Sequence, residues 1–513
     1  MNSTDRRIAL LPLDDRPVNV LLPGDVANVA GVALDVPDTA MLPAYRQSGD
    51  TDALAAWLRE RASDPNTTHL VVSIDMLLYG GLIASRTSHD SVRDVVARLD
   101  VLREIKRSRP ELTIFAVSLV MRASNSYSNA EEPEYWKDYG KDLHALGGAL
   151  HQQLDSTVTD QLDSLIEVPD GILSDYASRR ARNHMVNMNA LLLRNEGTID
   201  FLAITADDTA TFAAGSAEQV WLRHWMRFLP GARDTLMYPG ADEVGAALVA
   251  RAIASTDGIH PSFAARTAQE GGFDRVPPFE NGPLGESVDR QIRAAGAERA
   301  EAEADIVLVL HAPDPERHDM FRGYPETPDL DAADATVELV RRSLDEGSRV
   351  ALADVRFPNG ADAELLTRLA AAGLLERLEA FGAWNTAGNT IGSVIALCVA
   401  GEAGRASGSF DADASRRALL TRLLDDYAYQ AVIRSEKGAD LFPDRFPLAD
   451  DSRVEHARSV IRDDMNRMLR ETLPGGDWSV TSLTLPWRRS FEVAITLRRM
   501  VGRAQSLSPM SVG

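Results

Sequence analysis

Short apolar runs alternate with amphipathic helical patterns along most of this 513-residue chain. Buried strands separated by such helices are typical of a parallel sheet whose connections are right-handed crossovers. We therefore expect an α/β fold of parallel sheets with flanking helices. The strand candidates are RIALLPL, VALDVP, HLVVSI, TIFAVSLVM, FLAIT, TLMYP, DIVLVLHA, VALAD and EAFGAW, with IHPSFAA as a weaker one.

Two architectures fit this alternation. At about 150 residues per domain, a chain of this length is expected to form more than one hydrophobic core. The strand candidates also divide nearly equally into those before and those after residue 230. We favour two doubly wound, Rossmann-like domains around a cleft, followed by C-terminal helices, over an elaborated (β/α)8 barrel. The predicted units are an N-terminal domain at 1–230 with a helical insertion at about 123–198, a second α/β domain at 231–405 and a helical region at 406–513.

Net charge, cysteine count and hydropathy limit the classes of partner that the chain is expected to bind. A formal net charge of -22 argues against nucleic acid, because a nucleic-acid binder needs a basic face. The single cysteine, Cys398, excludes disulfides within the chain and thiolate metal clusters. No apolar window spans a bilayer, and the apolar run at the N-terminus is too short for a signal peptide. We expect a cytoplasmic protein with a small-molecule substrate and no membrane partner.

Polar residues follow nearly every predicted strand. The carboxyl ends of parallel strands meet at one edge of a sheet, where loops and helix N-termini converge. A single residue of this kind is explained by helix capping, but a whole series predicts a shared polar site. The series comprises Asp14, Asp15, Arg16, Asp75, Tyr79, Arg86, Arg122, Asp207, Asp208, Asp242, Glu243, Asp354, Trp384, Asn385 and Asn389.

The segment LPLDDRPVN, residues 11–19, poses the choice most sharply. Asp14 and Asp15 suit the cap of a following helix, and Pro17 suits its first turn. Alternatively, both carboxylates line the shared cleft, with Arg16 holding a neighbouring carboxylate in bidentate geometry. The long insertion would then roof the cleft, since its Arg179, Arg180 and Asn183 have no other evident partner.

Adjacent carboxylates in a cleft push their pKa values apart, so that one stays protonated while its neighbour ionises. This arrangement suits general acid and base chemistry. The expected catalytic carboxylates are Asp15, Asp75, Asp208 and Glu243. The expected substrate-binding residues are Asp14, Arg16, Tyr79, Arg86, Arg122, Asp207, Asp242, Asp354, Trp384, Asn385 and Asn389.

Several common chemistries lack their motifs. The chain has no dinucleotide fingerprint, no phosphate loop with its lysine, no HxH or HExxH pair and no GxSxG elbow. Two alternatives stay open. One is a hydrolase or lyase in which Asp14, Asp15 and Asp208 hold a Mg²⁺ or Mn²⁺ ion. The other is a non-catalytic protein that closes on a small polar ligand. No cofactor or metal site is firmly predicted.

Four separated blocks, LPLDDRPVN, SIDMLLYGGLIASR, PGADEVG and WNTAGNTIG, resemble the bacterial family known as domain of unknown function 4127. The resemblance covers roughly residues 6–500 and implies a shared site and an association with carbohydrate use. A carboxylate-rich cleft with Asn, Arg, Tyr and Trp suits sugars. The leading hypothesis is therefore a glycosidase-like hydrolase of a carbohydrate or glycoconjugate, in which paired carboxylates do the chemistry.

Overall fold

The computed structural model describes residues 6–154, 168–207, 209–320, 325, 327–443 and 447–500. Its first sheet has six strands in the order β2-β1-β3-β4-β5-β6, paired in parallel throughout. All six coincide with predicted apolar runs. The strands are β1 (Arg7–Leu11), β2 (Ala33–Asp35), β3 (Thr67–Ser73), β4 (Thr113–Val120), β5 (Phe201–Ala206) and β6 (Leu236–Pro239).

The second sheet has five parallel strands in the order β11-β10-β9-β7-β8. Two parallel sheets confirm the predicted α/β class. The weak run IHPSFAA contains β7, whereas β8 was not predicted because it is only two exposed residues long. The strands are β7 (Ser262–Thr267), β8 (Glu298–Arg299), β9 (Ile306–His311), β10 (Arg349–Asp354) and β11 (Ala380–Gly382).

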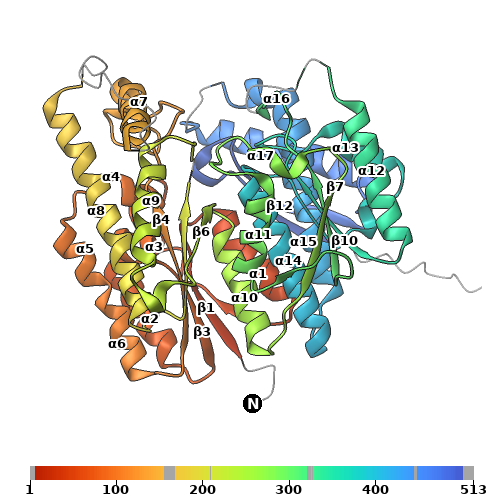
Figure 1. The fold of residues 1–513 in the computed structure, drawn as a ribbon. Helices are drawn as coiled ribbons and strands as arrows, with labels where there is room; N and C mark the ends of the chain where they lie inside the picture. The colour runs from red at the N-terminus through yellow and green to blue at the C-terminus, as the bar shows by residue number, and fades with distance from the viewer. Residues whose placement is uncertain are drawn as a thin grey trace, which may run out of the picture.

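A layer of helices lies between the two sheets (Figure 1). It consists of α1 (Pro17–Val29), α10 (Val244–Thr256), α11 (Leu284–Ala294) and α14 (Ala387–Ser407). These helices and the inner faces of both sheets share one hydrophobic core. Small residues let the layer pack closely, and a Cβ added at Gly392 of α14 would overlap the side chain of Glu243.

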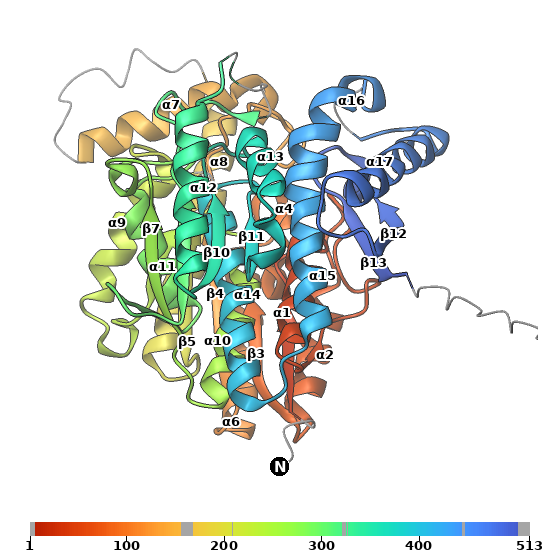
Figure 2. The ribbon, with the colours of Figure 1, turned by 90° about the vertical axis from the view of Figure 1, so that its right-hand side faces the viewer.

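Other helices cover the outer faces of the sheets (Figures 1 and 2). The first sheet is covered by α2 (Thr51–Ser63), α3 (Ile74–Tyr79), α5 (Val92–Arg98), α6 (Asp100–Ser108) and α8 (Asp170–Asn195), with α4 (Leu82–Thr87), α7 (Trp136–Leu154) and α9 (Ala214–Met226) nearby. The second is covered by α12 (Leu330–Asp345) and α13 (Ala363–Ala371). Short 3-10 turns lie at η2 (Pro230–Ala232), η3 (Gly272–Asp274), η5 (Leu375–Arg377) and η7 (Pro486–Arg488).

The C-terminal region packs on the second core. It contains α15 (Ala412–Arg422), the π-helix η6 (Leu423–Ile433), α16 (Arg434–Leu441) and α17 (Asp451–Glu471). These helices match the expected helical region, but an antiparallel pair, β12 (Trp478–Thr484) with β13 (Ala494–Arg499), follows them and was not predicted. The loop between β12 and β13 reaches back to the first sheet, where Trp487 contacts Asp15.

The predicted domain boundaries stay a prediction. Residue 230 falls between β5 and β6, and residue 405 falls inside α14. The shared central layer joins the two sheets through one core across these positions. Within the part of the chain that the structure describes, no helix combines the length and apolar character needed to cross a bilayer.

Candidate active site at the carboxyl edge of the first sheet

Arg16, just beyond β1, is buried among carboxylates. Its Nε and Nη2 lie 2.8 and 2.7 Å from Asp14 Oδ2, and its backbone amide donates to Asp14 Oδ1 at 3.0 Å. Nη1 and Nη2 form a bidentate pair with Asp242, at 3.1 and 2.5 Å. A bidentate pair of this kind fixes orientation as well as charge. The end of β1 is therefore fastened to the end of β6, four strands away in the sheet order.

The capping alternative for Asp14 and Asp15 is not what the structure contains. The residue at the N-cap of α1 is Arg16 itself, and no side chain caps that helix. Asp14 Oδ1 instead accepts from its own turn and from Asn19 Nδ2 at 2.7 Å. Pro17 does occupy the first turn, where its missing N–H costs nothing.

Asp242 also links the first sheet to the second. Its backbone amide donates to Asn389 Oδ1 at 3.2 Å, and Asn385 Nδ2 donates to its Oδ2 at 3.4 Å. Thr386 caps α14 between these two asparagines, and Asn385 has a φ of 61°, a left-handed conformation that Asn tolerates. Burial raises the pKa of Asp242 to about 6, against the opposing pull of Arg16.

A second group of charges lies at the ends of β4 and β5. Arg86 of α4 donates to Asp207 Oδ2 at 2.7 Å, and Arg122 Nη1 lies 3.6 Å from the same atom. Both guanidiniums also contact Glu131, and Arg122 Nε donates to Glu132 Oε1 at 2.7 Å. The two glutamates belong to the predicted insertion, so this segment reaches the sheet edge through ion pairs.

Trp487 joins these two groups from the far end of the sequence. Its indole N–H donates to Asp15 Oδ1 at 2.9 Å. The guanidinium of Arg16 lies 5.1 Å from its ring centroid and that of Arg489 lies 4.3 Å away, both within cation–π range. Arg489 in turn pairs with Glu131 at 2.6 Å and with both carboxylate oxygens of Glu492.

We call this set the carboxylate–arginine cluster. Among the described residues it brings seven carboxylates against four guanidiniums, so negative charge is in excess. The cluster therefore favours a neutral or cationic polar ligand over an anionic one. Its members are Asp14, Asp15, Glu131, Glu132, Asp207, Asp242, Glu492, Arg16, Arg86, Arg122 and Arg489, with Trp487 at its centre.

The carboxylates of the cluster differ in proton affinity. Asp15 is half-buried, and burial together with its neighbour Asp14 raises its pKa. Burial opposes ionisation of Glu131 as well, but Arg122, Arg489 and Arg86 outweigh it and hold the pKa of that carboxyl well below its usual range. Environments that separate pKa values in this way are found where one acid holds a proton and another is ionised.

Three of the predicted site residues lie beneath the edge rather than at it. Asp75 is buried in the first turn of α3, where its Oδ2 accepts from the Leu119 amide at 3.0 Å, and burial raises its pKa to about 6. The hydroxyl of Tyr79 donates to Asn183 Oδ1 at 2.8 Å. Glu243 is fully buried and accepts from Gln291 Nε2 at 2.6 Å. Their predicted roles in catalysis or binding stay predictions.

Two further predicted residues lie at the ends of strands of the second sheet. Asp354, at the end of β10, is buried and accepts from the backbone amides of Arg356 and Asp362. Trp384 is buried against Phe491, with ring centroids 5.4 Å apart. Asp208 lies outside the described residues, so its predicted separation from Asp75 stays a prediction.

The insertion fastens onto the loops of the first sheet. Arg180 of α8 donates to the carbonyls of Met121 and Arg122, at 2.7 and 3.0 Å, and pairs with Glu218. Arg179 donates to the Ser88 carbonyl at 2.7 Å, and Asn183 donates to the Ser85 carbonyl at 2.9 Å. These side chains anchor the segment through backbone carbonyls of the strand-end loops.

Sequence reasoning did not single out several members of the cluster. Glu131 and Glu132 form an acidic pair within the insertion, and PWRRSFE, residues 486–492, supplies Trp487, Arg489 and Glu492. The sequence feature that could have identified these three residues is the high density of arginine, aromatic and acidic residues in PWRRSFE. Tyr45 adds a second ring, 5.4 Å from that of Trp487.

The acidic residues of the cluster do not assemble around one point. Both oxygens of Asp14 are engaged by Arg16 or Asn19, and Asp15 accepts from Trp487. Within the described ranges, no three His, Cys, Asp or Glu side chains converge in a way that would hold a metal ion. The metal-binding alternative includes Asp208, which lies outside those ranges.

The chain is an α/β protein with two parallel sheets and a carboxylate-rich cluster of ion pairs at the carboxyl edge of the first sheet. The chain belongs to the DUF4127 family, described as "Protein of unknown function (DUF4127)", whose model matches residues 8–496. The resemblance seen in the four sequence blocks is thereby confirmed over nearly the whole chain. Comparison with curated proteins found no match.

One solved structure with partial similarity is the radical S-adenosylmethionine methyltransferase TsrM from Kitasatospora setae, with a tryptophan substrate and an S-adenosylmethionine analogue bound. The two chains share 12% identity over 74% of this chain and 73% of that one, with a TM-score of 0.17. A similarity this low carries no argument about fold or chemistry.

Proposed function

We propose that the protein is a hydrolase acting on a carbohydrate or glycoconjugate, with the carboxylate–arginine cluster as its active site. The observation that carries the proposal is the difference in pKa between carboxyls of the cluster. The pKa of Asp15 is raised and that of Glu131 is held low, within one network joined by Trp487 and Arg489. Glu131 shares Arg86 and Arg122 with Asp207, so the same guanidiniums also face the Asp207 carboxylate. Glycoside cleavage needs one carboxyl that donates a proton and another that is ionised.

Asp15 is the proposed proton donor. It is half-buried rather than enclosed, and its neighbour Asp14 disfavours a second negative charge beside it. The indole N–H of Trp487 fixes one carboxylate oxygen at 2.9 Å, which leaves the other oxygen for a leaving group. A positioned acid with a raised pKa is suited to protonating a glycosidic oxygen.

Asp207 is the proposed base or nucleophile. Arg86 holds it at 2.7 Å, and its side chain keeps 16% of its surface exposed, whereas Glu132 and Asp242 are almost fully enclosed. Glu131 anchors the surrounding arginines and is engaged by three of them. Glu131 is similarly exposed, at 18%, so Asp207 is preferred because fewer guanidiniums engage it.

Sugars suit the composition of the site. A neutral polyhydroxylated substrate matches an excess of carboxylates better than a phosphate or carboxylate substrate does. Guanidiniums of Arg16 and Arg489 already contact the Trp487 ring, so the half-buried ring of Tyr45 beside it is the aromatic surface proposed to contact a sugar. Asn385 offers an amide beside Asp242.

The test is a turnover screen on aryl glycosides and natural oligosaccharides. Asp15→Asn and Asp207→Asn are each expected to lower turnover about 100-fold or more, the contribution typical of a positioned acid or base. Asp440→Asn, at an exposed position outside the cluster, serves as the matched control and keeps wild-type turnover. Wild-type turnover in both site variants would overturn the proposed roles.

A further inference from the structure

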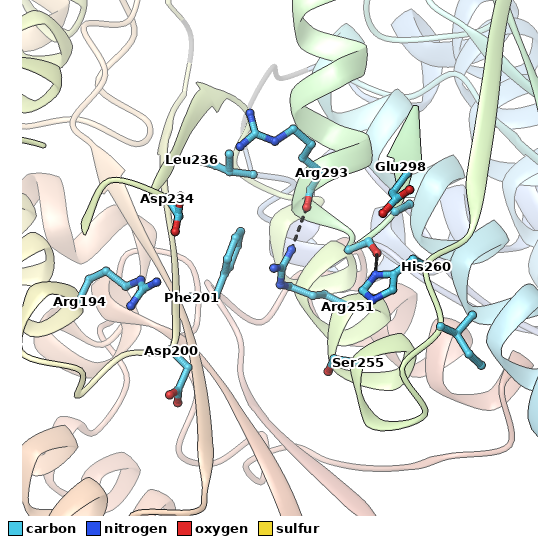
Figure 3. Close-up of a pocket in the computed structure, with 13 residues that line it drawn as sticks. Arg194, Asp200, Phe201, Asp234, Leu236, Arg251, Ser255, His260, Arg293 and Glu298 are labelled. Atoms are coloured by element: carbon cyan, nitrogen blue, oxygen red, sulfur yellow. Dashed lines mark hydrogen bonds between the residues drawn. The ribbon is translucent and has the colours of Figure 1, made fainter. Parts of the chain in front are cut away.

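A cavity of about 380 Å³ opens at the opposite edge of the sheets (Figure 3). Its lining includes Phe201 at the start of β5, Leu236 at the start of β6 and Glu298 at the start of β8. Because these residues begin their strands, the cavity lies at the amino edge, away from the carboxylate–arginine cluster. It is bordered by elements of both sheets.

Three arginines surround this cavity: Arg194 of α8, Arg251 of α10 and Arg293 of α11. Figure 3 shows the side chains of Arg194 and Arg251 on either side of Phe201. The guanidinium of Arg251 lies 3.7 Å from the ring centroid of Phe201, and one of its N–H groups donates to the Arg293 carbonyl at 2.8 Å. These two contacts hold the Arg251 side chain in place in the absence of a ligand.

The charges of these arginines are not compensated. None of the three forms an ion pair with any residue that the structure describes. The Nε atom of Arg194 is buried without a hydrogen-bond partner. Burial lowers the pKa of Arg251 to about 10, and repulsion from Arg194 and Arg293 adds to that shift. Arg194 and Arg251 are partly buried, whereas Arg293 is exposed at the rim. Unpaired, partly buried cations are costly, so two of them beside one cavity in a chain of net charge -22 indicate a missing anion.

The acidic residues around the cavity do not supply that anion. Asp200 already accepts from Lys106 Nζ at 2.9 Å and from the Ile114 amide at 2.7 Å. Asp234 and Glu298 are exposed at the rim and make no ion pair with the three arginines. Solvent screens such exposed carboxylates from the buried guanidinium.

We propose that this cavity binds a small phosphate ester, whose dianionic group is held by the partly buried Arg194 and Arg251, with the exposed Arg293 at the rim. Guanidinium groups bind phosphate oxygens in bidentate geometry, and three of them exceed what a single carboxylate needs. The cavity lies within the range of small-molecule sites, about 300 to 1,000 Å³, and is larger than a bare phosphate requires. Phe201 and Leu236 provide an apolar wall for the organic part.

The test is isothermal titration of the full-length protein with glucose 6-phosphate, glycerol phosphate, inorganic phosphate and glucose at constant ionic strength. We expect a phosphate ester to bind more tightly than inorganic phosphate, and glucose not to bind at this site. Arg251→Gln and Arg194→Gln each weaken binding about tenfold or more, as loss of a charge-assisted contact does. Arg470→Gln, at an exposed position far along the chain, is the matched control and binds as the wild type does.

The folding of the variants is checked by thermal unfolding without ligand. Arg251→Gln loses the contacts with Phe201 and the Arg293 carbonyl but also removes a cation that Arg194 and Arg293 repel, so one cooperative transition near the wild-type temperature is expected. The Asp15→Asn variant is expected to bind the ester normally, so this site is tested separately from the proposed hydrolase. Equal binding by wild type and Arg251→Gln, or no binding of any phosphate, overturns the proposal. Inorganic phosphate binding as tightly as the esters overturns the assignment of an ester.

Discussion

Replacement of Arg16 by Met is expected to destabilise the protein by about 3 to 5 kcal/mol at pH 7, the cost of leaving buried carboxylates without their cation. Arg16 is 4% exposed and contacts both Asp14 and Asp242. Methionine keeps the apolar stem and removes the guanidinium, so the loss reports the charge network rather than a cavity. Arg470→Met, at an exposed position outside the cluster, is the control and should change stability by about 0.5 kcal/mol at most.

The loss should also depend on pH. Burial raises the folded-state pKa of Asp242 to about 6, and Arg16 opposes that rise, so the pKa climbs further in Arg16→Met. A carboxyl that binds its proton more tightly when folded loses stability as pH rises from its unfolded value of 3.8 through its folded pKa. The deficit of Arg16→Met should therefore be smaller at pH 5 than at pH 8.

The measurement is urea unfolding of wild type and both variants followed by tryptophan fluorescence, with linear extrapolation to water. A deficit below about 1 kcal/mol at pH 7, within the range of ordinary surface changes, would refute the reasoning. So would a deficit that grows as the pH falls.

Three further predictions concern a buried carboxyl outside the cluster, the indole of Trp487 and the metal-dependent alternative. Glu280 is that carboxyl; its Oε1 accepts from the Gly388 amide at 2.6 Å. Burial raises the pKa of Glu280 to about 8, so this carboxyl keeps its proton in the folded protein and stability should fall as pH rises from about 4.5 through 8; Glu280→Gln should flatten the melting temperature between pH 6 and 9, and an unchanged slope would contradict this. Trp487→Phe removes the indole donor that lowers the pKa of Asp15 while keeping a ring, so the basic limb of the pH–rate profile should move to higher pH; a shift to lower pH would argue against Asp15 as the acid. Chelator treatment should leave turnover unchanged, whereas a loss restored by Mg²⁺ or Mn²⁺ would favour the metal-dependent alternative.

The sheets were predictable because their strands are buried on both faces and form continuous apolar runs, as TIFAVSLV does in β4. The antiparallel pair β12 and β13 was missed because its apolar pattern is irregular: the alternation of β12 breaks at a bulge between Val480 and Ser482, and in β13 only Leu497 is buried. β8 carries no apolar signal at all, since both of its residues are exposed.

Position at a strand end indicates which edge a residue occupies but not how deep it lies. Arg16 and Asp242 meet because β1 and β6 end at the same edge. Asp75 also follows a strand, but α3 begins at once, so its carboxylate faces the amide of Leu119 beneath the edge. Trp487 stands 472 positions from Asp15 in the chain, a contact that no local pattern contains.

The most direct test of the proposed active site compares substrates that differ only in their leaving group. A proton donor matters most when the leaving group is poor, so Asp15→Asn should lose about 100-fold or more in turnover on an alkyl glycoside and far less on the matching dinitrophenyl glycoside. Asp207→Asn should lose activity on both, because attack on the sugar is needed in each case. Equal losses on the two substrates in Asp15→Asn, or none on either, would contradict the assignment of Asp15 as the acid of a glycoside hydrolase.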